Sequence, residues 1–182
     1  MEASMALAQT NLIPALLEDA RIYKDGYVLL GVGNIELPSV EYMTETLSGF
    51  GLGGEIEVPV KGHFKSMTVK IKWNTVEPEA IQLLETTAHH LDIRGSVEKV
   101  DAGTGEFLDL PVKLVLQAAP KTGGLGTMEP AKKMDGETEL EVTYLKLWIN
   151  GVEQMEIDKL NLICNIQGTD LLQVLRINLG MI

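Results

Sequence analysis

The chain has 182 residues, 45% of them hydrophobic and 23% charged, with 26 acidic against 15 basic side chains and a formal net charge of −11. This composition is that of one globular domain and excludes wholesale disorder, while the excess negative charge disfavours tight binding to nucleic acid. No apolar run approaches the length of a membrane-spanning helix, so the chain is not expected to span a membrane with a helix. Glu2 stands where a secretory signal would carry a basic residue, so secretion by that route is not expected either.

The chain begins with a segment that is expected to lie outside the main fold. Residues 1–18 are predicted to be an N-terminal extension, with a short helix beginning at Pro14, because proline suits a first helical position. The dipeptide Asp25-Gly26 suits the two central positions of a tight hairpin turn. Residues 20–33 are therefore expected to form two short paired strands.

Residues 40–60 are predicted to form a long hairpin. Its first arm is polar on both faces, its second arm alternates between acidic and apolar residues, and the glycine-rich corner Gly49–Gly54 joins them. A hairpin with so few hydrophobic residues has little reason to be ordered in an isolated monomer. Composition alone leaves a surface loop as the alternative.

The residue pattern in the middle of the chain predicts three strands and a helix. Residues 66–74 alternate strictly between apolar and polar side chains, as a half-buried strand does. A helix is expected over residues 77–89, because two glutamates and Pro78 occupy its first turn. Two further strands and an exposed loop are expected over residues 91–100, 107–118 and 119–136.

The most regular pattern lies near the C-terminus. Residues 137–158 alternate on both sides of Asn150-Gly151, which predicts a hairpin with a tight turn. Leu140 and Val142 belong to its buried face, and either Tyr144 or Leu145 continues that face. A short helical segment follows, capped by Thr169 or Asp170, and its leucines are expected to be buried on the chain itself or on a neighbour: Leu171, Leu172, Leu175 and Leu179.

Together these elements predict a single mainly β (α+β) domain over residues 1–182. The expected architecture is an antiparallel β-barrel or sandwich with one helix about 77–89, the long hairpin about 40–60 and the C-terminal helical segment.

No catalytic, metal or cofactor site is expected. Cys164 is the single cysteine, and its apolar neighbours indicate a small buried hydrophobe rather than a nucleophile. His89 and His90 are adjacent and so point apart on a helix or a strand, which prevents them from gripping one metal ion. The glycine-rich corner has no following Lys-Ser/Thr pair and does not open a helix, as a phosphate-binding loop requires. The chain is therefore not expected to be an enzyme.

Several short motifs occur in a recognisable order. They are Asp25-Gly26, Ile35-x-Leu37-Pro38, an acidic-to-glycine hairpin, Tyr144-x-Lys146-Leu147, Glu156-Ile157-Asp158, Gly168-x-Asp170 and Asn178-Leu179-Gly180. In order and spacing they resemble the major tail tube protein of contractile-tailed phages and of phage-tail-like (R-type) bacteriocins. The resemblance covers most of residues 19–180.

The resemblance implies hexameric rings stacked into a hollow tube that serves DNA delivery or membrane puncture. The implied partners are further copies of the chain, a tail sheath protein, baseplate and tail terminator proteins, and a tape-measure protein inside the tube. DNA would pass through the lumen without specific binding. The implied location is the virion tail or bacteriocin particle, after synthesis in the bacterial host cytoplasm.

The resemblance also suggests roles for individual residues. An acidic lumen would repel the DNA backbone, and the hypothesis places four glutamates there because they share a period-two phase in the two hairpin arms: Glu41, Glu45, Glu55 and Glu57. Contacts between subunits are expected at the hairpin tip and the C-terminus: Gly49, Phe50, Leu52, Gly54, Leu175 and Leu179.

Two alternatives remain open at this point. One is the tube of a type VI secretion system, which shares the architecture and carries effectors instead of DNA. The other is a monomeric, non-enzymatic β-barrel binding domain. The sequence does not distinguish a DNA-carrying phage from a headless bacteriocin.

Overall fold

A computed structural model of the chain describes residues 12–30, 34–49, 51 and 53–181. The fold is mainly β, as predicted. The strands are β1 (Leu12–Lys24), β2 (Val28–Leu29), β3 (Ile35–Glu36), β4 (Tyr42–Leu47), β5 (Ile56–Phe64), β6 (Thr68–Trp73), β7 (His89–Asp101), β8 (Phe107–Gly124), β9 (Gly136–Ile149), β10 (Val152–Asp158), β11 (Ile163–Ile166) and β12 (Thr169–Asp170). Among the described residues there are two helices, α1 (Pro78–Gln82) and α2 (Gln173–Asn178), and neither is long enough to cross a membrane.

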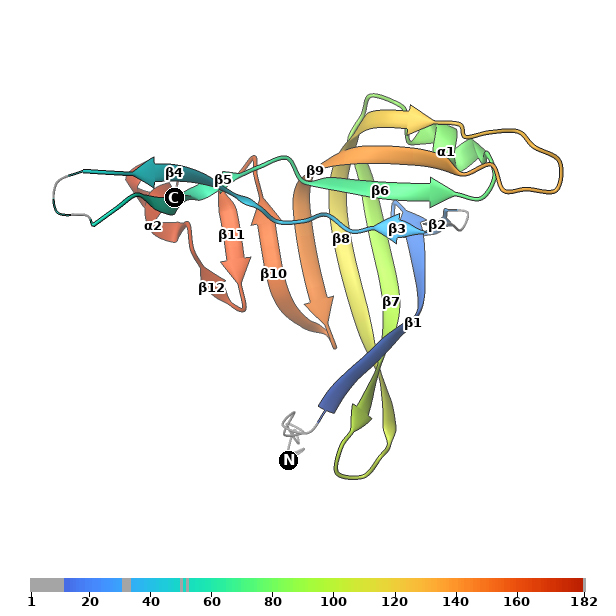
Figure 1. The fold of residues 1–182 in the computed structure, drawn as a ribbon, viewed down its shortest axis with the longest axis horizontal. Coiled ribbons are helices and arrows are strands. Elements are labelled where there is room, and N and C mark those ends of the chain that lie inside the picture. The colour runs from blue at the N-terminus through green and yellow to red at the C-terminus, as the bar shows by residue number, and fades with distance from the viewer. Residues whose placement is uncertain (1–11, 31–33, 50, 52, 182) are drawn as a thin grey trace.

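Ten strands form one antiparallel sheet in the order β12-β11-β10-β9-β8-β7-β1-β2, with β6 also paired to β9 and β3 to β6 (Figure 1). The sheet curls strongly. The N–H of Leu30 donates to Ile22 of β1, while the carbonyl of Asn34 accepts from Lys72 of β6. Leu30 and Asn34 are four residues apart, so these two edges lie within about 14 Å of each other.

The long strands β8 and β9 bend and join the two halves of the sheet (Figure 1). The first half of β9 pairs with β6 and its second half with β10. Between these halves, Thr143 has no partner in β8, because Val142 lies opposite Ala118 and Tyr144 opposite Gln117. This β-bulge reverses the alternation, so Leu145 continues the buried face and Tyr144 lies on the opposite one.

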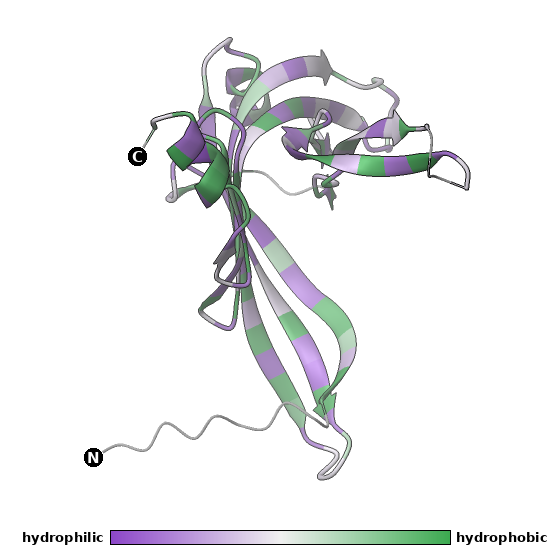
Figure 2. Cartoon of the chain, turned by 90° about the vertical axis from the view of Figure 1, so that its left-hand side faces the viewer, coloured by the Kyte–Doolittle hydropathy of each residue, from purple (hydrophilic) through white to green (hydrophobic). Residues whose placement is uncertain are grey.

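The hydrophobic core lies where the sheet curls, between β6 and the central strands β7 to β9. Figure 2 shows the alternation of hydrophilic and hydrophobic residues along these strands. Met67, just before β6, and the alternate β6 residues Val69, Ile71 and Trp73 belong to this core. Cys164 is buried in the same core, as predicted. The largest fully buried side chains are Leu30, Met67, Ile71, Leu83, Leu91, Leu116, Leu140, Leu145, Ile157 and Leu172.

Both tight turns predicted from dipeptides are present. Asp25 and Gly26 have φ angles of 53° and 80°, and Asn150 and Gly151 have φ angles of 51° and 74°. Positive φ at both central residues is the geometry of a type I′ turn, which matches the twist of the flanking strands.

The predicted helix over residues 77–89 is wrong in extent. α1 ends at Gln82, where a series of turns begins, and His89 already opens β7. Its N-cap residue, Glu77, makes no side-chain capping hydrogen bond, and so short a helix depends on packing for its stability. Ala80 and Leu83 supply that packing by anchoring the segment in the core.

Two other boundaries differ from the sequence prediction. The expected loop over 119–136 narrows to residues 125–135, because β8 continues to Gly124 and pairs with β9. The helix expected at Pro14 is wrong, because residues 12–18 belong to β1 and pair with β7. Long-range pairing outweighs the local preference of Pro14, and residues 1–11 lie outside the described part of the chain.

Candidate assembly surfaces

The β4–β5 hairpin forms a two-stranded sheet of its own and extends beyond the edge of the ten-stranded sheet (Figure 1). Every residue of β4 is exposed. The predicted hairpin over residues 40–60 is therefore present, and the surface-loop alternative does not hold for its described residues. Because an isolated two-stranded hairpin is marginally stable in water, this one needs another surface to pack against.

The two faces of the hairpin differ in polarity. The register places Leu47 opposite Ile56, and directly opposed residues share a face while successive residues alternate. One face therefore carries apolar side chains that are 38 to 49% exposed: Met43, Leu47, Ile56 and Val58. The other face carries polar side chains, among them Thr44, Thr46 and Glu57.

The four glutamates assigned to the lumen do not all share one face. The register opposes odd-numbered residues of one arm to even-numbered residues of the other, so Glu45 lies on the apolar face and Glu57 on the polar face. Glu55 continues the alternation of Glu57. Glu41 precedes β4 and forms an ion pair with Lys65 at 3.2 Å. The assumption of a common face is wrong because the phase within each arm does not give the register between arms.

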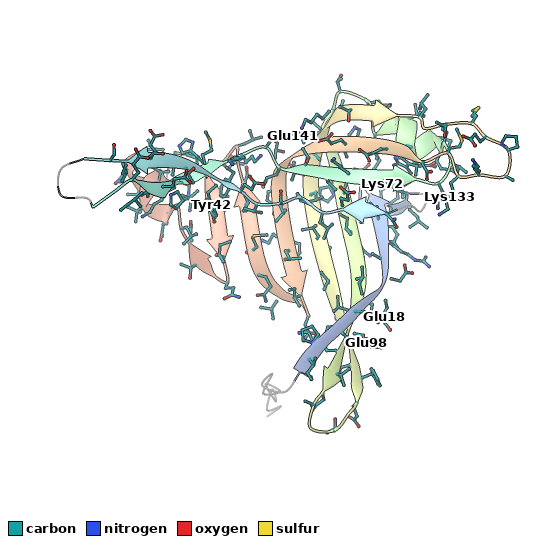
Figure 3. All side chains as sticks on the ribbon, in the orientation of Figure 1. Glu18, Tyr42, Lys72, Glu98, Lys133 and Glu141 are labelled. Atoms are coloured by element: carbon teal, nitrogen blue, oxygen red, sulfur yellow. The ribbon has the colours of Figure 1, made fainter. Side chains whose placement is uncertain are left out.

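The base of the hairpin is attached to the C-terminal segment. The Tyr42 ring packs on Phe64 with centroids 5.1 Å apart, and Tyr42 marks this junction in Figure 3. Gly62 adopts a φ of +77° where the chain meets Leu172 and Leu175. A pocket of about 390 Å³ lies beside the junction, lined by residues including Tyr42, Pro59, Cys164 and Leu172.

The residues expected to contact other subunits lie in two places. Gly49 and Gly54 are at the hairpin tip, and, apart from their chain neighbours, no described residue lies within 4 Å of the position of a Cβ. Phe50 and Leu52 lie outside the described residues. At the C-terminus, Leu175 packs partly against the core of its own chain, whereas Leu179 is exposed. Their contact with a neighbouring subunit stays a prediction.

The helix α2 leaves a stripe of apolar residues exposed. Val174 and Ile177 lie three residues apart on α2 and are exposed, so they share one side of the helix, and Leu171 in the turn before α2 is exposed as well. The opposite side is fixed, since Arg176 donates to the Leu162 carbonyl at 2.8 Å and pairs with Asp170. This stripe adds a second apolar surface without a partner in the described chain.

The face of the ten-stranded sheet opposite the core carries interlocked charges. Two rows of opposed residues cross β7 to β10 there, namely Asp92, Val115, Lys146 and Glu156, and Arg94, Lys113, Trp148 and Glu153. Asp92 pairs with Arg94 at 2.7 Å and with Lys113 at 3.4 Å, and Lys146 pairs with Glu153 at 2.9 Å and with Glu156 at 3.1 Å. We term these two rows the charged face.

Aromatic rings take part in the same network. Lys113 and Lys146 lie 5.6 and 5.3 Å from the centroid of the Trp148 ring, within the range of a cation–π contact. The Tyr144 hydroxyl donates to Glu156 at 2.8 Å, and burial together with this hydrogen bond raises the pKa of Tyr144 to about 12. Tyr144 therefore stays neutral and acts as a hydrogen-bond donor over the whole ordinary pH range.

The pKa shifts of the network favour its charged state. Burial alone would raise the pKa of Asp92, but the hydrogen bond from Arg94 and the nearby charge of Lys113 outweigh it and hold that pKa below its usual value. The hydrogen bond to Glu153 raises the pKa of Lys146 against the effect of burial. The ion pairs thus favour the ionised forms of Asp92 and Lys146.

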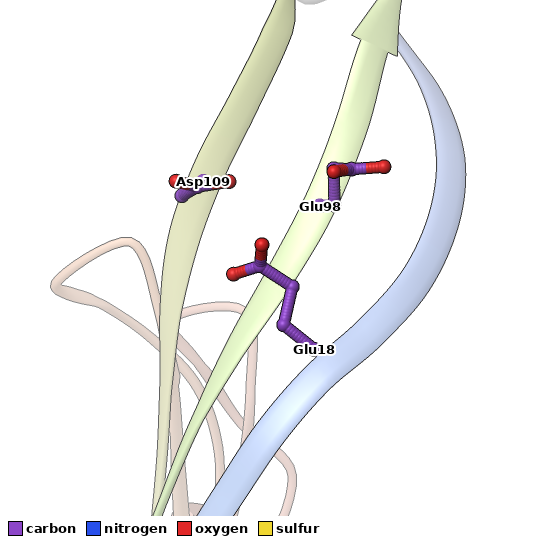
Figure 4. A group of neighbouring side chains, drawn as sticks. All are labelled: Glu18, Glu98 and Asp109. Carbon is purple, nitrogen blue, oxygen red and sulfur yellow. The ribbon is translucent and has the colours of Figure 1, made fainter.

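Further along the same face, three carboxylates cluster. The carboxylate oxygens of Glu18, Glu98 and Asp109 lie within 4.8 Å of one another (Figure 4), and Ser96 donates a hydrogen bond to Glu18 at 2.8 Å. Opposed strand positions place Glu98 and Asp109 on the side of the sheet that carries Asp92 and Lys113. Negative charge is therefore concentrated next to the charged face.

Comparison with known proteins identifies the family. The family model described as phage tail tube protein FII matches residues 14–180. The chain belongs to this family. The tail tube protein of Escherichia phage P2 is 25% identical to it over 176 residues, which span 93% of this chain and 99% of that protein.

A solved structure shares the fold of this tail tube protein. The sheath/tube terminator of an extracellular contractile injection system, in its extended state, superposes with a TM-score of 0.52 over 75% of this chain and 97% of that chain. The two are 13% identical, so the likeness concerns the fold alone. The family match shows a structural role as a phage tail tube protein, and the protein is a component of the virion tail.

The tail tube motifs and the assembly surfaces are not equally visible in the sequence. The hairpin could be found because its arms alternate around a glycine-rich corner. The charged face could not be found from the sequence, because its residues come from four strands and become neighbours only through the register in which these strands pair. The available signal was the alternation of polar with buried residues within single strands, as for Lys146 in β9 or Asp92 in β7.

Proposed function

We propose that this tail tube protein forms hexameric rings that stack into the hollow inner tube of a contractile tail or of a phage-tail-like bacteriocin. The tube serves as the conduit for DNA delivery or as the rod that punctures a membrane. The chain acts as a structural protein in this proposal and performs no catalysis.

One observation carries the proposal: the hairpin β4–β5 has an exposed apolar face and no place in the main sheet. Several exposed apolar side chains on one face of a hairpin mark a protein–protein contact. Stacked copies of the chain supply that contact, and the apolar stripe on α2 supplies a second one. Ring formation also covers the sheet edges at β2 and β12, whose unpaired backbone groups otherwise invite aggregation.

The glycine-rich tip is proposed to reach an adjacent ring, with Gly49, Phe50, Leu52 and Gly54 at the contact. Leu179 lies in the C-terminal contact, and Leu175 supports it from inside the subunit. Among the hairpin glutamates, Glu55 and Glu57 are the candidates for a lumen position because they belong to the polar face. Glu45 belongs to the apolar face and Glu41 is paired to Lys65, so neither suits that role as well.

The remaining partners follow from the same proposal. A sheath protein surrounds the tube, baseplate and terminator proteins bind its ends, and a tape-measure protein fills it before DNA passes. The tube is made in the cytoplasm of the bacterial host. A type VI-like secretion tube would use the same assembly surfaces, and a monomeric binding domain would leave them uncovered.

The test is negative-stain electron microscopy of the purified protein over a concentration series. Rings, or hollow tubes of uniform width, are the expected result. Dispersed monomers at every concentration, even after baseplate proteins are added as nuclei, would overturn the proposal and favour a monomeric binding domain.

A further inference from the structure

The charged face is the bare side of the sheet. The hydrophobic core draws its members from the opposite side and from β6, α1, β11 and Leu172. Val115 is buried on the charged face, between Asp92 and Lys146 in the register, and does not belong to that core. None of the exposed large apolar side chains of the described chain lies in the two rows. This surface therefore lacks the apolar centre of a protein–protein contact.

The position of the core decides which face can line a central hole. If the curved sheet contributes to a closed ring, one face must point to the lumen and the other outward. The core face is occupied by β6, α1 and the segment before α2, so these elements form the outer layer. The bare face is then the inner one. This step depends on the tube proposed above.

The cations of the two rows, Arg94, Lys113 and Lys146, are already engaged in ion pairs. The side chains of Arg94 and Lys113 are 51% and 45% exposed, while Asp92 beneath them is only 5% exposed. Lys146 is 20% exposed and is held between Glu153 and Glu156. A phosphate group approaching these cations must compete with carboxylates fixed at ion-pair distance. Arg21 of β1 lies opposite Arg94 and so on the same side of the sheet. It is a basic residue that has no ion pair among the described residues.

We propose that the charged face is the wall of the conduit, and that Asp92, Glu153 and Glu156 occupy its cations so that a passing phosphate chain is not held. The neighbouring carboxylates Glu18, Glu98 and Asp109 add repulsion along the same side. A wall built this way gains cross-strand ion pairs without becoming a binding site for nucleic acid.

The test removes carboxylates and leaves the cations in place. The variant Glu153→Gln/Glu156→Gln frees Lys146 and raises the charge of each subunit by two. The control Glu36→Gln/Glu129→Gln makes the same change in charge at the exposed ion pairs with Lys72 and Lys132, away from the charged face. Tubes of each protein are assembled with a fluorescent single-stranded oligonucleotide, sedimented, and treated with nuclease.

The expected result is oligonucleotide that cosediments with the charged-face variant and resists nuclease. Retention should exceed that of wild type and control roughly tenfold at about 50 mM salt and decline as salt rises. Equal retention by variant and control, no retention, or bound oligonucleotide that the nuclease digests would overturn the inference. Absence of tubes from the wild-type protein would instead refute the proposed function.

A second variant keeps the test decisive if the double substitution prevents assembly. Glu153 is the more exposed of the two carboxylates, and Glu153→Gln leaves the pair between Lys146 and Glu156 intact. Its tubes are expected to retain less oligonucleotide than those of the double variant and more than those of the control Glu36→Gln. Retention equal to that control would overturn the inference.

Discussion

Gly62 and Leu172 fit so closely that a Cβ on Gly62 would lie 3.2 Å from the Leu172 Cδ2 atom. This contact ties the base of the β4–β5 hairpin to the C-terminal segment, which itself reaches the core through Leu172. The orientation of the hairpin therefore depends on a glycine that has both a positive φ and a close neighbour.

Gly62→Ala should destabilise the protein by about 1–2 kcal/mol, because alanine is strained at a φ of +77° and its methyl group would press on Leu172. Urea unfolding of the purified protein measures this change. Gly53→Ala is the matched control, since Gly53 has no neighbour within 4 Å and no positive φ. Equal stability of the two variants would contradict the role of this contact.

The apolar face of the hairpin should be needed for assembly and not for folding. Leu47→Ser/Ile56→Ser is expected to change the free energy of unfolding by no more than about 1 kcal/mol, because both side chains are half exposed in the subunit. Tubes should be lost, as seen by electron microscopy. Thr46→Ser, on the polar face, should assemble normally; tubes from the double serine variant would refute the contact.

The acidic residues of the polar hairpin face should affect passage of DNA. In assembled phage particles, Glu55→Lys/Glu57→Lys is expected to lower DNA delivery about tenfold or more, because cations in the lumen would bind the phosphate backbone. DNA delivery is measured as genome release into liposomes or host cells. Glu106→Lys/Glu129→Lys gives the same change in charge on exposed loops. Normal delivery by the first variant would contradict a lumen position for Glu55 and Glu57.

Tyr144 should ionise only at a pH well above the ordinary pKa of a tyrosine. Its pKa is raised to about 12 in the folded protein, above the ordinary value of 10.0, so the fold favours its neutral form. The stability that this provides is complete below pH 10 and is lost as the pH rises towards 12. Ultraviolet titration of Tyr144→Phe should lack the ionisation near pH 12. Loss of an ionisation near pH 10 instead would contradict the hydrogen bond to Glu156.

The features that the sequence determined by itself are local. Asn150-Gly151 and Asp25-Gly26 specify their turns because few other residues tolerate positive φ. Alternation over residues 66–74 identified β6, and the apolar surroundings of Cys164 predicted its burial. Each of these depends on conformational preferences that act within a few residues.

Tertiary structure decided the features that depend on pairing between distant segments. The bulge at Thr143 turns Tyr144 outward and Leu145 inward, a choice that the alternation left open. The register of the hairpin separates Glu45 from Glu57, and pairing with β7 extends residues 12–18 although Pro14 suits a helix. A register shift of one residue moves every side chain to the other face, and only long-range contacts select it. For the same reason, the charged face exists only once four strands are aligned.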